Sequence, residues 1–277
     1  MPTNTELTTY ENLGPFEKNI VYILSIIYAP ISLTQLKDCL AAAKIKTNKG
    51  LMIDASYKFR SLMLKELRPT VDMLEKAKII QKREYGRLKL ECTIAEIAIR
   101  QAVKEQKFNS LLKAIETKFD LMNGKTRDHL VAAVRILFYQ KKMDDILDYY
   151  NQHKDQVYEA SSLSNIMNII ADPFDPDWFQ LISGPLLTEM MRDPFVDDIT
   201  KWQNNANHFE YAEKLVAAHS NRCEQQLEAL VLDFWFMIGN TDAVKKWLKK
   251  HPKKDSFIAL TQEFSRRLRE LANNAYG

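Results

Sequence analysis

Residues 79–93 (IIQKREYGRLKLECT) carry the one convincing strand–turn–strand pattern in a chain that otherwise reads as helical. Leu88 and Leu90 alternate with charged residues, and Gly86 supplies a turn between the two halves, which is typical of a β-hairpin. Only seven glycines occur in 277 residues, and Leu, Ala, Lys and Glu are common, a composition that favours helices. We therefore expect a mainly α-helical fold with a single short hairpin.

Amphipathic helices are expected on the N-terminal side of the hairpin. Residues 1–14 are polar and predict a loose segment. Pro15 suits the first turn of a helix, and Pro30 is expected to stop that helix. Ser32 and Gln35 have the spacing of a capping box, so a second helix is predicted to begin there.

A third helical stretch covers residues 57–78 and leads directly into the hairpin. Pro69 interrupts this stretch, because proline lacks the backbone N–H that a helix interior needs, and it predicts a kink or a new helix over 70–78. After the hairpin, Thr93 and Glu96 predict a second capping box at the start of the next helix.

Positive charge is concentrated around the hairpin. Residues 44–107 contain 16 basic and 8 acidic residues, whereas the whole chain has a net charge of only +3. Phosphate backbones attract such a segment, so nucleic acid is one expected partner. Lysines that only keep the surface hydrated would give the same count, and the sequence leaves this second interpretation open.

Residues 63–80 (MLKELRPTVDMLEKAKII) resemble the third helix and first wing strand of a winged helix-turn-helix domain, in which the hairpin is the wing. The resemblance implies a winged-helix domain over residues 15–107 that contacts double-stranded DNA largely through its phosphates. It equally allows a wing that contacts protein. The candidate nucleic-acid contacts are Lys58, Arg60, Lys65, Arg68, Lys76, Lys78, Lys82, Arg83, Arg87 and Lys89.

Residues 108–277 contain helical runs and an internal repeat at an offset of 98 residues. The segments 130–153 and 228–251 share the pattern Asp-x-[Ile/Val]-x-x-[Tyr/Trp], in which Asp144 or Asp242 is expected to cap the second helix of a pair. Three units of about 34 residues fit this offset, which is similar to degenerate tetratricopeptide repeats. The expected architecture of residues 108–277 is an α-solenoid of helix pairs.

Enzyme and cofactor motifs are missing from the sequence. Gly124-Lys125 lacks the upstream glycine of a phosphate-binding loop, and the histidines and cysteines lack metal-ligand spacing. We therefore expect a non-enzymatic protein with no metal or cofactor, and keep an active site without a motif as a third alternative. No apolar run is long enough to cross a bilayer, so no membrane contact and a cytoplasmic location are the default expectations.

A winged helix followed by helical repeats is similar to the accessory modules of bacterial STAND-type regulators and Swi/Snf-type helicases. The resemblance implies a regulator, or the N-terminal part of a larger regulator or helicase, whose repeats dock a protein partner. Phe174, Trp178 and Phe179 form an apolar cluster that is either core or a groove for such a partner. The alternative function is a protein-interaction scaffold that uses the winged helix as a docking or dimerisation face. The sequence leaves the partner and the oligomeric state open.

Overall fold

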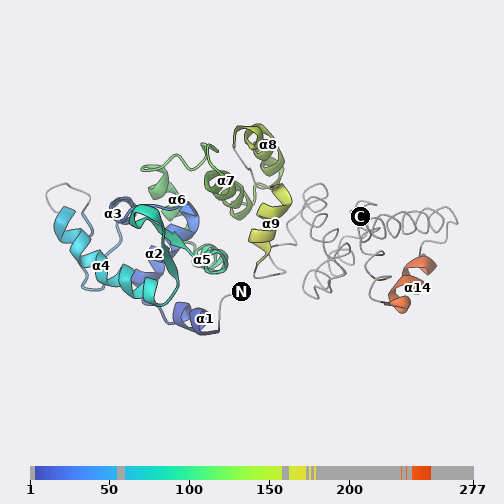
Figure 1. Ribbon diagram of the computed structural model, residues 1–277, viewed down its shortest axis with the longest axis horizontal. Coiled ribbons are helices and arrows are strands. Elements are labelled where there is room, and N and C mark those ends of the chain that lie inside the picture. Colours follow the sequence, from blue (N-terminus) through green and yellow to red (C-terminus); the bar gives the residue numbers. More distant parts are fainter. Residues whose placement is uncertain are drawn as a thin grey trace, which may run out of the picture. The chain divides into compact units, whose positions relative to one another are not determined.

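Helices dominate the computed structural model, and the sheet in its described part is one two-stranded antiparallel hairpin (Figure 1). The structure describes residues 4–54, 60–157, 162–172 and 239–250, together with Asp175, Trp178, Leu232 and Trp235. The expected mainly helical fold is therefore confirmed. Within these ranges, no helix has both the length and the apolar character that crossing a bilayer requires.

The chain divides into two compact units. The first unit comprises residues 1–162 and 169–173, and the second comprises residues 163–168 and 174–277. The elements of the first unit are α1 (Asn4–Glu11), α2 (Pro15–Ile27), α3 (Leu33–Ala42), α4 (Arg60–Lys76), β1 (Ile80–Lys82), the 3-10 turn η2 (Glu84–Gly86), β2 (Leu88–Leu90), α5 (Cys92–Lys104), α6 (Phe108–Glu116), α7 (Arg127–Tyr139), α8 (Met143–His153) and the 3-10 turn η3 (Lys154–Gln156). α9 (Leu163–Ala171) contributes residues to both units, and α14 (Thr241–Lys250) belongs to the second.

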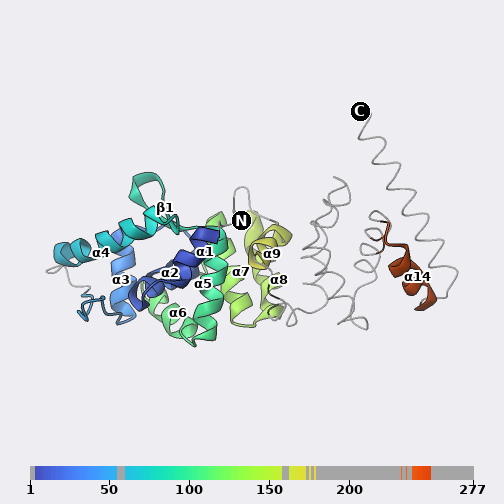
Figure 2. The same cartoon turned by 90° about the horizontal axis from the view of Figure 1, so that it is seen from below.

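α2 forms the centre of the first unit, where it packs against α3, α5, α6, α7 and β2 (Figure 2). Its side chains are buried around the whole helix, and Ile20, Tyr22 and Ile26 are completely shielded from solvent. Pro15 is its first residue, as expected. Burial of each large apolar side chain contributes about 1.5–3 kcal/mol, so α2 contributes substantially to the hydrophobic stabilisation of this unit.

The first unit extends beyond the domain expected over residues 15–107. α6 and α7 both pack against α2, and the compact unit reaches residue 162. A helix that is apolar on all sides must be covered on all sides. α3 and α5 cover only part of α2, and helices that follow residue 107 cover the remainder.

Residues 1–14, expected to be loose, contain the helix α1. Tyr10 and Leu13 are buried, with exposed fractions of 4% and 9%. A helix of eight residues is too short to be stable alone in water. Burial of these two side chains gives this segment the tertiary contacts that hold it.

The capping box expected at Ser32 is confirmed. Ser32 Oγ accepts a hydrogen bond from the Gln35 N–H at 3.2 Å, and Gln35 Oε1 accepts one from the Ser32 N–H at 2.8 Å. Just before it, Ile31 exchanges two backbone hydrogen bonds with Leu88 of β2, at 3.0 and 2.7 Å. These bonds attach the hairpin to the segment between α2 and α3.

The hairpin expected in residues 79–93 is also confirmed. β1 and β2 pair antiparallel, with Ile80 opposite Leu90. Tyr85 and Gly86 form the turn, and both have positive φ angles, 57° and 67°. Glycine adopts this conformation readily, whereas a tyrosine there is held by the turn around it.

The helix before the hairpin differs from the expected one. α4 continues through Pro69 and ends at Lys76, so the prediction of a separate helix over 70–78 is wrong. Pro69 lies on the exposed side of α4, where water can hydrate the carbonyl that loses its usual helical partner. Leu67 and Val71, on either side of the proline, are buried and hold both halves of the helix to the core.

α5 begins at a different cap from the predicted one. Glu91 is the N-cap, and its side chain accepts a hydrogen bond from the Ile94 N–H at 3.0 Å. The capping box predicted for Thr93 and Glu96 is wrong, because Glu96 points into the core and forms a buried ion pair there. A cap directly after β2 keeps the connection from the hairpin to α5 short.

The turn between α7 and α8 recurs 98 residues later in the chain. Lys141 and Gly239 occupy equivalent positions and have φ angles of 63° and 72°. In both turns the next N–H donates to the carbonyl five residues earlier, at 2.9 Å for Lys142 and 2.8 Å for Asn240. α8 and α14 then begin at the same position of the repeat, so the two copies share local structure at this turn.

Asp144 and Asp242 are not the N-caps that the sequence predicted. Both residues lie inside the first turn of their helices, α8 and α14. In the second copy, Asn240 Oδ1 accepts the Ala243 N–H at 3.2 Å and so acts as the cap. A carboxylate in the first turn still interacts favourably with the helix dipole, which explains why aspartate recurs.

α3, α4, α5 and α7 are each followed by a residue with positive φ that is not glycine. These residues are Lys44, Lys78, Gln106 and Lys141, with φ between 55° and 63°. In each case the following N–H bonds to the carbonyl five residues back, as in a Schellman motif. The left-handed conformation costs a non-glycine residue about 1–2 kcal/mol, so these helix ends carry local strain.

We expect Lys141→Gly to stabilise the α7–α8 pair by about 0.5–1 kcal/mol. Glycine relieves the left-handed strain of the folded state, and the added conformational entropy of the unfolded chain cancels only part of this gain. Native-state hydrogen exchange of the α7 and α8 amides measures the change as slower exchange. Lys142→Gly is the matched control, because Lys142 has a φ of −94° and gains no relief. Faster exchange in Lys141→Gly would contradict the assignment of strain.

Glu105 connects the end of α5 to α2. Its carboxylate accepts hydrogen bonds from Tyr22 Oη at 2.9 Å, Gln101 Nε2 at 3.0 Å and Lys107 Nζ at 2.7 Å. Burial alone would raise the pKa of this carboxyl group. The hydrogen bonds from Lys107, Gln101 and Tyr22 outweigh burial and lower the pKa from 4.5 to about 2.

The lowered pKa of Glu105 predicts acid sensitivity. Because the folded-state pKa lies below the unfolded one, the stability that Glu105 contributes is present above about pH 4.5 and is lost as the pH falls through about 2. Glu105→Gln removes this titration, so urea midpoints followed by circular dichroism should fall less steeply between these pH values in the variant. Equal slopes for the variant and the wild type would show that Glu105 is not coupled to folding.

Candidate nucleic-acid interface

The hairpin tip, residues 83–87, is the most exposed part of the candidate interface. Tyr85 is 95% exposed. Arg83 and Arg87 flank it and are exposed, and within the described part of the chain neither takes part in an ion pair that compensates its charge. The two guanidinium groups can bind phosphates, and the tyrosine ring between them can stack on a flat group.

α4 presents a stripe of mixed charge to solvent. Lys65, Arg68 and Lys76 are exposed along it, and Asp72 and Met73 lie between them. Met73 is 40% exposed, which is high for a large apolar side chain. The stripe therefore combines three predicted basic contacts with a carboxylate and an apolar side chain, whereas the hairpin tip combines two arginines with the exposed carboxylate of Glu84.

Lys82 is held by the protein's own carboxylates. Its Nζ lies 3.0 Å from Asp72 Oδ1 and also forms an ion pair with Glu75. The hydrogen bonds to Glu75 and Asp72 raise the pKa of this lysine. Its charge is thus compensated locally, although the side chain is exposed.

Lys89 faces the protein and not solvent. Its side chain is 15% exposed, and Nζ lies 3.0 and 3.1 Å from the two carboxylate oxygens of Asp128. The ammonium group also lies 4.9 Å from the centre of the Tyr28 ring. Lys89 is therefore directed away from the exposed surface on which it was predicted.

Two further predicted basic residues, Arg60 and Lys78, lie at the ends of α4. Lys78 is exposed and lies between α4 and β1, outside the helix in which it was expected. Arg60 is the first residue of α4, with a side chain outside the described part, and Lys58 lies outside the described residues. Lys49, which the sequence analysis did not select, pairs with Glu66 of α4 at 2.9 Å.

The predicted apolar partner cluster is described only at Trp178. This side chain is 7% exposed, which favours the core interpretation for Trp178 itself. Phe174 and Phe179 lie outside the described residues. A groove formed by the three residues stays a prediction.

Among the described residues, no group of three or more His, Cys, Asp and Glu side chains could hold a metal ion. A cavity of about 630 Å³ is lined by residues of α1, α2 and their surroundings, and Glu17 is the only carboxylate in its lining. Cys39 is buried, and burial raises the pKa of its thiol to about 12, which makes it a poor nucleophile.

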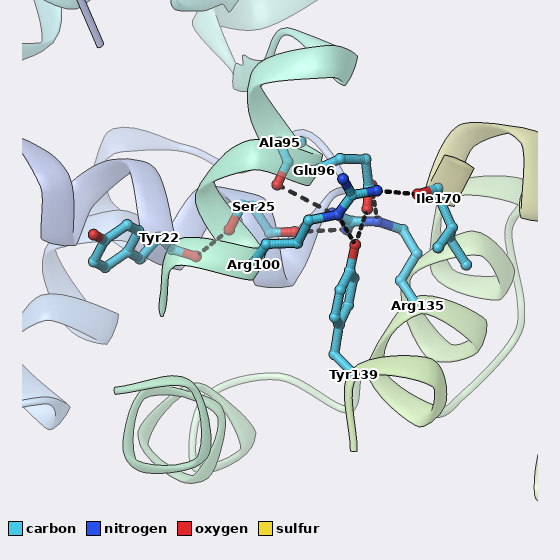
Figure 3. A network of polar contacts seen from close by, with 8 residues as sticks. All are labelled: Tyr22, Ser25, Ala95, Glu96, Arg100, Arg135, Tyr139 and Ile170. Carbon is cyan, nitrogen blue, oxygen red and sulfur yellow. Dashed lines mark hydrogen bonds and ion pairs between the residues drawn. The ribbon is translucent and has the colours of Figure 1, made fainter. Parts of the chain in front are cut away.

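A buried polar network holds α5, which continues from the hairpin, in place (Figure 3). Arg135 of α7 donates from Nε to Glu96 Oε1 at 2.5 Å and from Nη1 to the Ser25 carbonyl of α2 at 2.6 Å. Tyr139 Oη donates to the other oxygen of Glu96 at 2.6 Å. Arg100 donates to the carbonyl of Ile170 at 2.5 Å, so the network also reaches α9.

All the ionised groups of this network are buried. Glu96 and Arg135 have no exposed surface, and Arg100 is 4% exposed. Burial raises the pKa of Tyr139, so its hydroxyl stays protonated and donates to the carboxylate. This network was not predicted from the sequence. Its only signal is a charged residue within an apolar helix, as in the run LVAAVRILFY that contains Arg135.

Glu96→Leu should destabilise the first unit by about 3–5 kcal/mol, because it leaves a buried guanidinium without its counter-charge. The double variant with Arg135→Met removes both charges, so we expect it to recover a large part of this loss. Chemical unfolding monitored by circular dichroism gives the free energies. Losses that simply add in the double variant would show that the two side chains are not energetically coupled.

Comparisons with known proteins return nothing: no family model, no curated protein and no solved structure matches this chain.

Proposed function

We propose that the first unit contains a winged helix-turn-helix that binds double-stranded DNA, largely through its phosphates. The order α2, α3, α4 and hairpin supports this proposal, as does the extended segment at Ile31 that bonds to β2. In such a domain α4 is the third helix and the hairpin is the wing. The observation that carries the proposal is the exposed wing tip, where Arg83 and Arg87 flank Tyr85.

Contacts at the wing would position a duplex without reading its sequence in detail. Arginine pairs with phosphate oxygens through two parallel N–H groups, and such contacts carry little sequence information. The stripe on α4 would lie along the same duplex with Lys65, Arg68 and Lys76. Asp72 in that stripe is paired with Lys82, and the wing tip carries the carboxylate of Glu84, so the two surfaces would share the phosphate contacts.

The helix pairs that follow the winged helix in the sequence are the proposed docking site for a protein partner. The recurrence of the α7–α8 turn at Gly239 and α14 supports an array of related pairs. Stacked pairs form an extended concave surface, which is the usual binding surface of helical solenoids. On this proposal the protein is a non-enzymatic cytoplasmic regulator, or the N-terminal part of a larger one.

Arg83→Glu combined with Arg87→Glu should weaken binding to duplex DNA about tenfold or more. It should also reduce the slope of log K against log salt by about 2, because two phosphate contacts are lost. Fluorescence anisotropy with a labelled duplex, beginning at about 50 mM salt, measures both quantities.

The matched control is Lys113→Glu with Lys142→Glu, which makes the same charge change on exposed residues of α6 and of the turn between α7 and α8. The control should lose much less affinity. Wild-type protein that shows no binding at about 50 mM salt would overturn the nucleic-acid proposal, because phosphate contacts are strong under that condition.

The charge balance of α4 favours a second candidate, a protein-interaction scaffold. Met73 is exposed in the stripe, and Asp72 with Glu75 holds Lys82, so this face is less suited to phosphates than a purely basic one. On this alternative the winged helix serves as a docking or dimerisation face. Light scattering discriminates between the two candidates, because a dimer through α4 that persists at high salt supports the scaffold.

A further inference from the structure

We propose that a pocket beside the wing binds a phosphate ester group, and that a nucleic-acid strand lying on the wing supplies it. This inference rests on the proposed function and extends the binding surface to the loop between α6 and α7. The pocket has a volume of about 320 Å³ and lies between the Ile27–Ile31 segment, Arg87 of the wing and residues 118–129. Its size is at the lower end of the range for small-ligand pockets, which suits a single nucleotide unit.

Two cations line this pocket from different parts of the chain. Arg87 comes from the wing, and Lys118 follows the end of α6. Both side chains are exposed, and neither takes part in an ion pair among the described residues. Uncompensated guanidinium and ammonium groups are the usual protein partners of a phosphate dianion or diester.

His129 of α7 adds a directed donor. Thr126 Oγ1 accepts the backbone N–H of His129 at 3.2 Å and lies 2.9 Å from His129 Nδ1. In the neutral tautomer whose Nδ1 accepts the threonine proton, the ring proton lies on Nε2. This N–H belongs to a side chain that lines the pocket. A protonated imidazole donates from Nε2 as well.

Gln35 contributes a further oriented donor. Its Oε1 is already used in the capping box with Ser32, at 2.8 Å. The side-chain carbonyl is thereby fixed, and the amide NH2 group is left to bond elsewhere. Because Gln35 lines the pocket, its NH2 group is available to a phosphate oxygen.

The rest of the lining suits the sugar and base and not the phosphate. Pro30 and Phe119 are half-buried and offer apolar contacts, and an aromatic ring provides a face for stacking. Asp120 also lines the pocket and opposes an anion. Arg87, Lys118 and His129 outweigh it, and a carboxylate can accept a hydrogen bond from a sugar hydroxyl.

A strand phosphate is the favoured source because of the position of Arg87. This residue belongs both to the wing tip and to the pocket, so a strand that contacts Arg83 and Tyr85 would meet Arg87 at the edge of the pocket. A free mononucleotide has the same chemistry. The two sources differ in whether a long strand is needed for tight binding.

The first experiment uses a nucleoside 5′-monophosphate and the matching nucleoside as probes, with the full chain observed by NMR. We expect the monophosphate to shift the His129 ring signals and the Arg87 side-chain N–H signal, and the nucleoside to leave them unchanged. Lys118→Glu should weaken the response about tenfold, whereas Lys113→Glu on α6 should leave it close to wild type. Absent shifts in the wild type, or equal responses in the two variants, overturn the pocket assignment.

The second experiment measures duplex DNA binding by the same variants. We expect Lys118→Glu to bind about tenfold more weakly than Lys113→Glu, with a salt slope lower by about 1. If the monophosphate binds but the duplex does not, the strand is excluded as the source, and the proposed function fails separately. If Arg83→Glu weakens duplex binding but Lys118→Glu matches Lys113→Glu, the wing proposal stands and the pocket is not part of the strand's path.

Discussion

The ion pair between Arg135 and Glu96 is the constraint on which the first unit depends. Both groups are fully buried, so each would be unstable in the core without the other. Arg135 also bonds to the carbonyl of Ser25, and Tyr139 occupies the second oxygen of Glu96. One polar cluster therefore fixes α2, α5 and α7 relative to one another, in an interior that apolar contacts alone would position less specifically.

The position of the hairpin follows from this constraint. α5 begins at Cys92, two residues after β2 ends, and its cap Glu91 lies between them. From the other side, Ile31 holds β2 through two backbone hydrogen bonds. The hairpin is thus attached at its base to two rigid parts of the core while its tip reaches solvent. On the proposal that the hairpin tip binds a partner, this fixed support means that little conformational entropy is lost on binding.

Local signals explain which parts of this structure could be predicted. The box at Ser32 and Gln35 and the turn at Gly86 depend on neighbouring residues, and both are observed. The predicted helix boundary at Pro69 is wrong, because burial of Leu67 and Val71 outweighs the backbone penalty of one exposed proline. The capping role predicted for Glu96 is wrong, because its partner, Arg135, is 39 residues away in the sequence, and no local pattern shows a contact over that separation.

The sequence predicts where along the chain the candidate site lies, but not which side chains of that site lie together. Charge counting identified the basic segment, but pairing removes Lys82 and Lys89 from it, through Asp72 and Asp128. Lys118 and His129 were missed, because they come next to Arg87 only after α6 and α7 fold onto α2. The left-handed lysines after α3, α4 and α7 were equally hidden, since glycine is the usual signal for that conformation.

We propose that the hairpin tip is a contact surface for nucleic acid, and hydrogen exchange of the wild-type full chain with and without duplex DNA tests this most directly. We expect slower exchange at residues 83–87, and protection that disappears when salt is raised to about 0.5 M, because screening and counterion release weaken phosphate contacts. Unchanged exchange at these residues, or protection confined to α4 and insensitive to salt, would contradict it.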